Sequence, residues 1–131
     1  MPKIITFMGK SIEDVEKMPM EEFVKLLPAR RRRTIQRGLL QKQKKFFDKV
    51  RKAKLDKSKK MIKTHIRDIV IIPEMLGLAI YVHNGKEFIP VIITSEMLGH
   101  LLGEFALTRK KVQHSAPGLG ATKSSSAMAV K

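Results

Sequence analysis

The sequence predicts an α+β fold, in which a three-stranded, mainly antiparallel sheet with short helices follows a basic helical N-terminal extension and precedes an extended C-terminal tail. Apolar residues recur at helical spacing in the first half of the chain and give way to β-branched-rich runs in the centre. Small residues then replace both patterns. We therefore expect a helical basic extension over 1–60, an α+β core domain over 61–105 and an extended basic tail over 106–131.

Short helices separated by prolines are expected at the start of the chain. Ser11 with Asp14 three residues later is typical of a helix start that has a carboxylate in its first turn. Pro19 suits the first position of a second short helix. Pro28 interrupts that helix, and a basic helical turn then ends at Gly38.

A long amphipathic helix is predicted after Gly38. Its apolar residues, at helical spacing, are Leu39, Leu40, Phe46, Phe47, Val50 and Ala53. Its opposite face consists of Gln41, Lys42, Lys44, Lys45, Lys49, Arg51 and Lys52. One stripe can thus pack on protein while the other lies on phosphates, and residues 54–63 are expected to form a basic linker.

Three β-branched-rich runs, at 69–72, 78–82 and 88–93, predict the strands of the sheet. Between the second and third runs, the sequence 83–86 contains Asn-Gly. This dipeptide is typical of two-residue hairpin loops, because it supplies two positive φ values.

The register set by such a loop places Pro90 opposite Ala79, at a hydrogen-bonding site that proline cannot serve. This predicts a bulge or a break. After the last strand, Thr94, Ser95 and Glu96 are expected to begin a short helix that Gly103 ends.

Basic residues are concentrated in one part of the chain. The formal net charge is +15, and residues 30–67 alone hold seventeen Lys and Arg against two acids. Residues 1–29 and 68–105 are slightly acidic, and 106–131 carry five bases and no acid. A charge run is usually a solvated helix face, but such a face normally includes acids at i+4, which are scarce here. The distribution favours a polyanionic partner, most commonly a phosphate backbone.

Few residues suggest catalysis or metal binding. The chain has no cysteine, which excludes disulfides and thiolate catalysis and fits a reducing compartment. The sequence lacks an apolar run long enough for a signal peptide or a membrane span, so a soluble intracellular protein is expected. Glu96 and His100 are spaced to share a helix face, but two ligands make a poor metal site, and a surface hydrogen bond is the more common role.

Region 62–125 closely resembles the small-subunit ribosomal protein family numbered nineteen. The motifs that carry the resemblance are Pro73-Glu74-Met75-Leu76-Gly77, Val82-His83-Asn84-Gly85-Lys86, Phe88-Ile89-Pro90-Val91, Glu96-Met97-Leu98-Gly99-His100 and Gly103-Glu104-Phe105 through Thr108-Arg109. The N-terminal extension and the stretch 110–118 look like the archaeal and eukaryotic branch of the family.

The resemblance implies a non-enzymatic, cytoplasmic protein in the head of the small subunit, without a cofactor, a metal or a membrane partner. Its implied partners are small-subunit ribosomal RNA, ribosomal protein thirteen, other head proteins, and the aminoacyl-site transfer RNA, toward which the tail extends near the decoding site. By analogy with family positions, RNA contacts are expected at Lys63, His65, Arg67, His83, Asn84, Lys86, His100, Arg109, Lys110, Lys111 and His114. Charge indicates further contacts at Arg30, Arg31, Arg32, Arg33, Arg37, Lys42, Lys44, Lys45, Lys49, Arg51, Lys52 and Lys123.

The alternative that the charge distribution also permits is a free DNA-binding or chromatin-type protein whose basic helix lies in a groove. An enzyme ranks last among the three classes, because no convincing nucleophile, base or metal cluster is present in the sequence.

Overall fold

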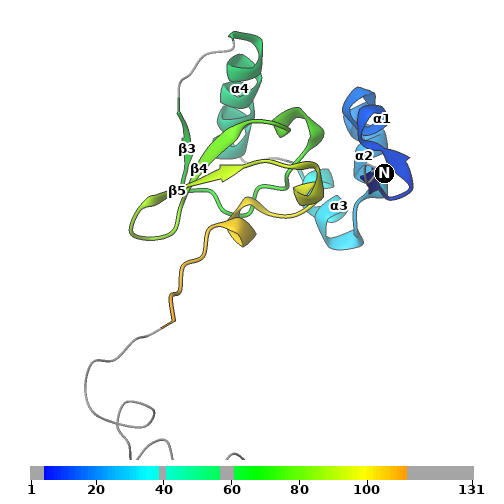
Figure 1. The fold of residues 1–131 in the computed structure, drawn as a ribbon. Coiled ribbons are helices and arrows are strands. Elements are labelled where there is room, and N and C mark those ends of the chain that lie inside the picture. Colours follow the sequence, from blue (N-terminus) through cyan, green and yellow to red (C-terminus); the bar gives the residue numbers. More distant parts are fainter. Residues whose placement is uncertain (1–4, 39–40, 57–60, 112–131) are drawn as a thin grey trace, which may run out of the picture.

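The computed structural model describes residues 5–38, 41–56 and 61–111. Its helices are α1 (Ile12–Lys17), α2 (Met20–Leu26), α3 (Ala29–Gln36) and α4 (Gln41–Asp56). Its strands are β1 (Thr6–Phe7), β2 (Lys10–Ser11), β3 (Ile62–Thr64), β4 (Ala79–His83) and β5 (Phe88–Ile92). Short 3-10 turns lie at η1 (Pro73–Met75), η2 (Ser95–Met97) and η3 (Leu102–Phe105). The α+β class is confirmed, with α1, α2 and α3 grouped to one side of the sheet (Figure 1).

Capping residues set the limits of the N-terminal helices as the sequence predicts. The Ser11 hydroxyl accepts a hydrogen bond from the Asp14 backbone N–H at 3.2 Å and donates to the Asp14 carboxylate at 2.6 Å. Pro19 and Pro28 occupy the N-cap positions of α2 and α3, so Pro19 lies one residue before the first helical position predicted for it. Gly38, with φ of 89°, follows the end of α3. Each proline therefore starts a new helix where the previous one ends.

The amphipathic character of α4 is confirmed. Phe46, Phe47 and Val50 are buried, whereas the lysines on the other face, from Lys44 to Lys52, are exposed. Leu39 and Leu40 lie outside the described residues. The helix continues to Asp56, so the linker expected from residue 54 begins later than predicted.

The first strand of the main sheet is not the one predicted. The order is β3-β4-β5, with β3 parallel to β4 and β4 antiparallel to β5, so the sheet is mixed. β3 lies in the segment expected to be a linker. Ile62 and Thr64 are buried on either side of the exposed Lys63. This alternation is a strand pattern, but it is only three residues long and was hidden by the surrounding lysines.

The run 69–72 is extended but belongs to no strand. It lies beside residues 99–102, where the Ile71 N–H donates to the His100 carbonyl at 2.8 Å and a single bridge joins Val70 to Leu101. All four residues of the run are buried. Burial on both sides accounts for the continuous apolar run, which resembles a central strand in sequence.

The hairpin loop between β4 and β5 differs from the prediction. His83 pairs with Phe88, so four residues, 84–87, separate the strands. Gly85 has a φ of 101°, whereas Asn84 does not have a positive φ. Instead the Asn84 side-chain oxygen accepts hydrogen bonds from the backbone N–H groups of Lys86 and Glu87, at 2.9 and 2.8 Å. The asparagine shapes this loop through its side chain rather than through a left-handed backbone.

Because the loop is two residues longer than predicted, the register of β4 and β5 shifts by two residues. The expected conflict at Pro90 disappears, and the prediction of a bulge or break there is wrong. Pro90 pairs with Tyr81 within a continuous strand. Asn84 N–H donates to the Glu87 carbonyl and Ile93 N–H donates to the Leu78 carbonyl. These two bonds show which opposed pairs of β4 and β5 are hydrogen-bonded, because hydrogen-bonded and non-hydrogen-bonded pairs alternate along an antiparallel ladder. In that alternation Pro90 occupies a non-hydrogen-bonded site. Its nitrogen therefore faces away from β4, where no donor is needed.

The helix predicted from Thr94 to Gly103 is instead two 3-10 turns. η2 ends after Met97, and Gly99, with φ of 77°, turns the backbone before η3 begins. The Thr94 side chain makes no capping hydrogen bond. Gly103 lies inside η3, where an added Cβ would be 2.9 Å from the Arg67 carbonyl oxygen. Close packing against Arg67, rather than helix termination, explains the glycine at this position.

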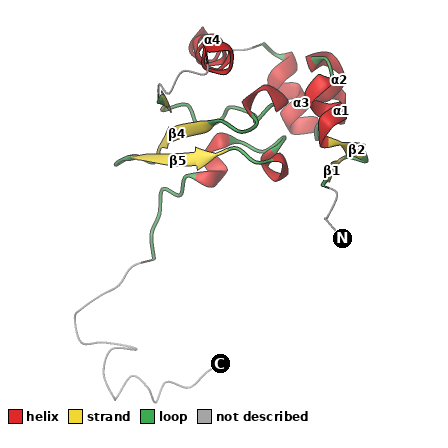
Figure 2. Ribbon diagram, turned by 45° about the horizontal axis from the view of Figure 1, so that its top comes forward, coloured by secondary structure: helices red, strands yellow, loops and turns green. Residues whose placement is uncertain are grey.

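Among the described residues, one hydrophobic cluster joins the N-terminal helices to the sheet. It includes Phe23 and Leu27 from the α2 region, Val50 from α4, and Ile80 and Val82 from β4. α4 lies against one side of the sheet (Figure 2). The helices of the extension thus share their core with the sheet, while the division into three parts stays a prediction.

Gly99 and Gly77 offer a matched test of that shared core, because their φ values are 77° and 78°. An alanine Cβ at Gly99 would lie 2.9 Å from the Leu27 side chain, whereas none of the described atoms lies within 4 Å of one at Gly77. Each Gly→Ala change should cost about 1–2 kcal/mol for the left-handed backbone. Gly99→Ala should cost about 1–3 kcal/mol more through overpacking of Leu27. Urea denaturation measures both, and equal losses would contradict the packing of the extension on the core.

Candidate nucleic-acid interface

The cations of α3 divide into exposed and partly buried side chains. Arg30, Arg33 and the C-cap residue Arg37 are exposed to solvent, whereas Arg31 and Arg32 are half-buried. α3 has no buried residue and no acid in its first turn. The helix therefore presents a dense positive surface whose self-repulsion is relieved when an anion binds.

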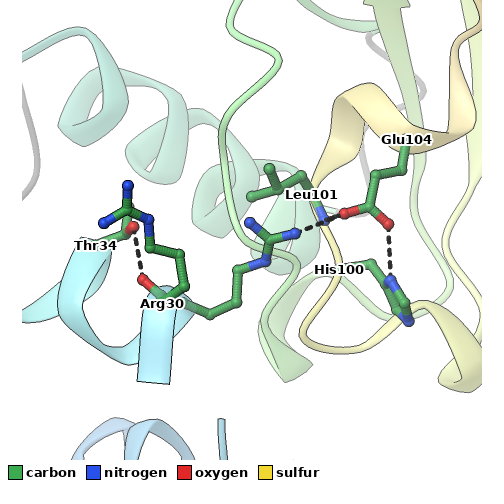
Figure 3. Close-up of polar contacts among 6 residues, drawn as sticks. Arg30, Thr34, His100, Leu101 and Glu104 are labelled. Atoms are coloured by element: carbon green, nitrogen blue, oxygen red, sulfur yellow. Dashed lines mark hydrogen bonds and ion pairs between the residues drawn. The ribbon is translucent and has the colours of Figure 1, made fainter. Parts of the chain in front are cut away.

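Glu104 ties α3 to the turn after Leu101. Its carboxylate accepts from the Arg31 guanidinium at 2.8 Å. It contacts His100 Nδ1 at 2.7 Å (Figure 3). It also accepts from the Leu101 backbone N–H at 3.3 Å. Arg31 and His100 lie along one shallow groove with Arg30. Two predicted RNA contacts, Arg31 and His100, are thereby brought together although they are far apart in sequence.

The pKa of Glu104 reflects these contacts. Partial burial acts to raise its pKa, but the hydrogen bonds from His100 and the Leu101 N–H, with the charges of His100 and Arg31, outweigh burial and lower the pKa below 4.5. The carboxylate is therefore ionised at neutral pH.

The exposed lysines of α4 form a second positive surface. Lys44, Lys45, Lys49 and Lys52 are all exposed, while the side chain of Lys42 lies outside the described residues. Arg51 is also exposed but pairs with Glu74 at 3.0 Å, and this hydrogen bond and charge raise its pKa. The surface thus offers compact ammonium groups suited to phosphate contact.

Arg67 is positioned differently from the other predicted RNA contacts. Its half-buried guanidinium donates to the carbonyl oxygens of His83 at 2.8 Å, Gly103 at 2.7 Å and Ala106. These bonds join the end of β4 to η3 and to the start of the tail. The guanidinium is therefore engaged in holding the fold, and its predicted RNA contact has the least support.

The remaining predicted contacts gather around the β4–β5 loop and the tail. Lys63, His65 and Lys86 are exposed, and His83 and Asn84 are half-buried. Arg109, Lys110 and Lys111 are exposed residues that follow η3. His114 and Lys123 lie outside the described residues.

The sequence did not point to Phe88 as part of this surface. Its ring lies 5.0 Å from His65 and 4.8 Å from His83, measured between ring centroids, and the Lys63 Nζ lies 5.4 Å from its centroid. A phenylalanine in a strand is normally assigned to the core. Strand alternation with the buried Val91 was the only available signal that it faces outward.

The predicted pairing of Glu96 and His100 on one helix face is wrong, because η2 ends before Gly99 and the carboxylate partner of His100 is Glu104. Within the described part of the chain, His, Asp and Glu form no cluster of three that could hold a metal. Over the same residues, none of the helices combines the length and apolarity that crossing a bilayer requires.

Replacing Arg67 tests its structural role. Arg67→Lys keeps the charge but carries all its N–H donors on one nitrogen, whereas the guanidinium bonds the three carbonyls from two nitrogens. The free energy of unfolding should therefore fall by about 3 kcal/mol, given about 1.5–3 kcal/mol per charged hydrogen bond. Arg33→Lys, at an exposed position, should change it by less than about 0.5 kcal/mol. Urea denaturation compares the two, and similar losses would show that Arg67 does not hold the fold.

Glu104→Gln tests the ion pair by which Glu104 of η3 holds Arg31 of α3. Because the folded-state pKa of Glu104 is lowered, its contribution to stability is fully present above pH 4.5 and is lost as pH falls through the folded-state value. The variant should be less stable than the wild type by about 1 kcal/mol or less at neutral pH, since the pair is partly exposed. That difference should shrink in acid. Urea denaturation at several pH values measures it, and a pH-independent difference, or one matched by Glu96→Gln, would contradict this role of the ion pair.

A family profile described as "Ribosomal protein S19" matches residues 33–114. A similar curated relative is the "Small ribosomal subunit protein uS19" of Saccharolobus solfataricus, which is 50% identical over 130 residues, covering 98% of this chain and 93% of the relative.

Proposed function

Because the chain belongs to the ribosomal protein S19 family, we propose that it binds small-subunit ribosomal RNA through the exposed cations of α3 and α4. The observation that carries this proposal is the segregation of charge on the folded chain. Glu74 and Glu104 each pair with one arginine, while the exposed cations of the two helices include Arg30, Arg33, Lys44, Lys45, Lys49 and Lys52. The remaining positive charge stays available to a polyanion.

Family membership establishes the coarser role. The protein is a structural, non-enzymatic component of the small subunit of cytoplasmic ribosomes, as the sequence predicts. Identity of 50% with an archaeal relative over nearly the whole chain agrees with the predicted archaeal and eukaryotic branch. The alternative of a free chromatin-type protein has no comparable support.

Recognition in this proposal is mainly electrostatic. Lysine and arginine side chains displace counterions condensed on the RNA backbone, and the folded domain fixes which phosphates they reach. α4 suits this mode because its apolar stripe anchors it to the sheet while its lysines remain exposed. A rigid helix loses little conformational freedom when it binds, so its charges contribute more to affinity.

Two finer roles are part of the same proposal. Ribosomal protein thirteen is the proposed protein partner, beside other proteins of the subunit head. The tail that begins with the exposed Arg109, Lys110 and Lys111 is proposed to extend toward the decoding site and the aminoacyl-site transfer RNA. Both roles rest on the family resemblance and on the basic composition of residues 106–131.

The salt dependence of binding to a ribosomal RNA fragment tests the electrostatic mechanism. With about ten phosphate contacts, the slope of log K against log salt should be roughly −7 to −9. The double variant Arg30→Glu/Arg33→Glu should reduce the steepness by about 1.5 units or more, because two contacts are lost and two repulsions are added. A filter-binding or fluorescence titration at several salt concentrations measures the slope.

The matched control is Lys17→Glu/Lys25→Glu, which makes the same charge change on α1 and α2, outside the basic segment. It should leave the slope closer to the wild-type value. A flat wild-type slope, or equal effects of the two double variants, would rule out binding through α3.

A further inference from the structure

The sheet has one buried face and one face open to solvent. On β4, Ile80 and Val82 are buried, whereas Tyr81 and His83 between and beyond them are only partly covered. β3 and β5 alternate in the same way, with Thr64 and Val91 buried. Since α4 and the hydrophobic cluster cover the buried face, the opposite face presents its side chains outward. Those side chains are Lys63, His65, Tyr81, His83, Phe88, Pro90 and Ile92.

Three aromatic rings meet at one end of this open face. The His65 and His83 centroids lie 4.6 Å apart with an angle of 35° between the ring planes. Phe88 meets both histidines edge-on, with interplanar angles of 76° and 72°. Each ring comes from a different strand or its immediate extension. The three rings are hereafter the aromatic triad.

Charge and hydrogen-bonding groups surround the aromatic triad. Lys63 Nζ lies 5.4 Å from the Phe88 centroid, and Lys86 is exposed in the adjoining loop. His83 Nδ1 accepts a hydrogen bond from the Gly85 backbone N–H at 3.0 Å. In the neutral ring the proton is therefore on Nε2, which becomes the donor that His83 offers to a ligand.

A cross-strand aromatic pair such as His83 and Phe88 also stabilises a hairpin without any ligand. Stabilisation alone does not require the third ring, because His65 lies beyond the end of β3 and is exposed. Nor does it account for a lysine beside the rings. Aromatic rings on an open sheet face, flanked by cations, are the arrangement by which proteins hold unstacked bases of single-stranded RNA.

We propose that the aromatic triad is a stacking site for one unpaired base of RNA, with Lys63 contacting the adjoining phosphate. The inference rests on the proposed RNA-binding function and adds a chemical class of ligand to it. The base is a nucleotide in a loop, bulge or strand end, because bases within a duplex are already stacked on their neighbours. The exposed ring of His65, beside the half-buried ring of Phe88, supplies the stacking surface.

The test uses the full chain and an oligouridine RNA that carries one 2-aminopurine, a base whose fluorescence is quenched when it stacks on a ring. Wild-type protein should bind at low salt and quench the probe. His65→Ala/Phe88→Leu should bind about 5- to 150-fold more weakly and should not quench it. Its salt slope should equal that of the wild type, since neither change removes a permanent charge. Lys63→Gln should instead make the slope less steep by about 0.7.

The matched control is Phe105→Leu, which alters a half-buried aromatic residue outside the triad and should preserve both binding and quenching. Urea denaturation of each variant checks the fold, and His65→Ala alone serves if the double variant does not fold, because His65 is exposed.

The outcomes separate the two proposals. Binding of the ribosomal RNA fragment without quenching by the wild type, or quenching retained in His65→Ala/Phe88→Leu, would overturn the stacking site and leave the proposed function intact. Failure of the wild type to bind either RNA at low salt would overturn both.

Discussion

The hydrogen bonds of Arg67 are the interaction on which the rest of the fold depends. One guanidinium joins the end of β4, the η3 turn and the start of the tail through three backbone carbonyls. Those carbonyls belong to segments that share few regular ladder bonds, so a planar donor with several N–H groups is needed to hold them together. Gly103 completes the arrangement, because an added Cβ would touch the Arg67 backbone.

Two acidic residues link the basic helices α3 and α4 to the rest of the fold. Glu104 holds Arg31, and Glu74 holds Arg51, so one arginine of α3 and one of α4 are neutralised against the core. The other cations of these helices remain at the surface, where water screens their repulsion. These ion pairs orient the two basic helices, and the excess positive charge stays at the surface.

Sequence reasoning succeeded where one strong local signal decides the structure. Ser11, Pro19, Pro28 and Gly38 marked helix limits that the structure confirms. It failed where distant segments decide, as with β3, a three-residue strand that forms only because β4 lies beside it. The prediction of the hairpin register was wrong for a different reason. An asparagine can shape a loop through its backbone or through its side chain, and Asn84 does so through its side chain. The exposed cations of the candidate interface were predictable from charge, but the structural use of Arg67 and the outward position of Phe88 were not.

Pro90 has a consequence for the newly made chain. β5 is an outer strand of its sheet, and the outer edge of a sheet can pair with any other exposed strand. At Pro90 the ring replaces an N–H that would otherwise face outward from that edge. A second molecule that approached to extend the sheet would find a missing donor and a bulky ring in the middle of β5. The same residue that fits the hairpin therefore helps to keep separate copies of the protein from joining edge to edge before they reach the ribosome.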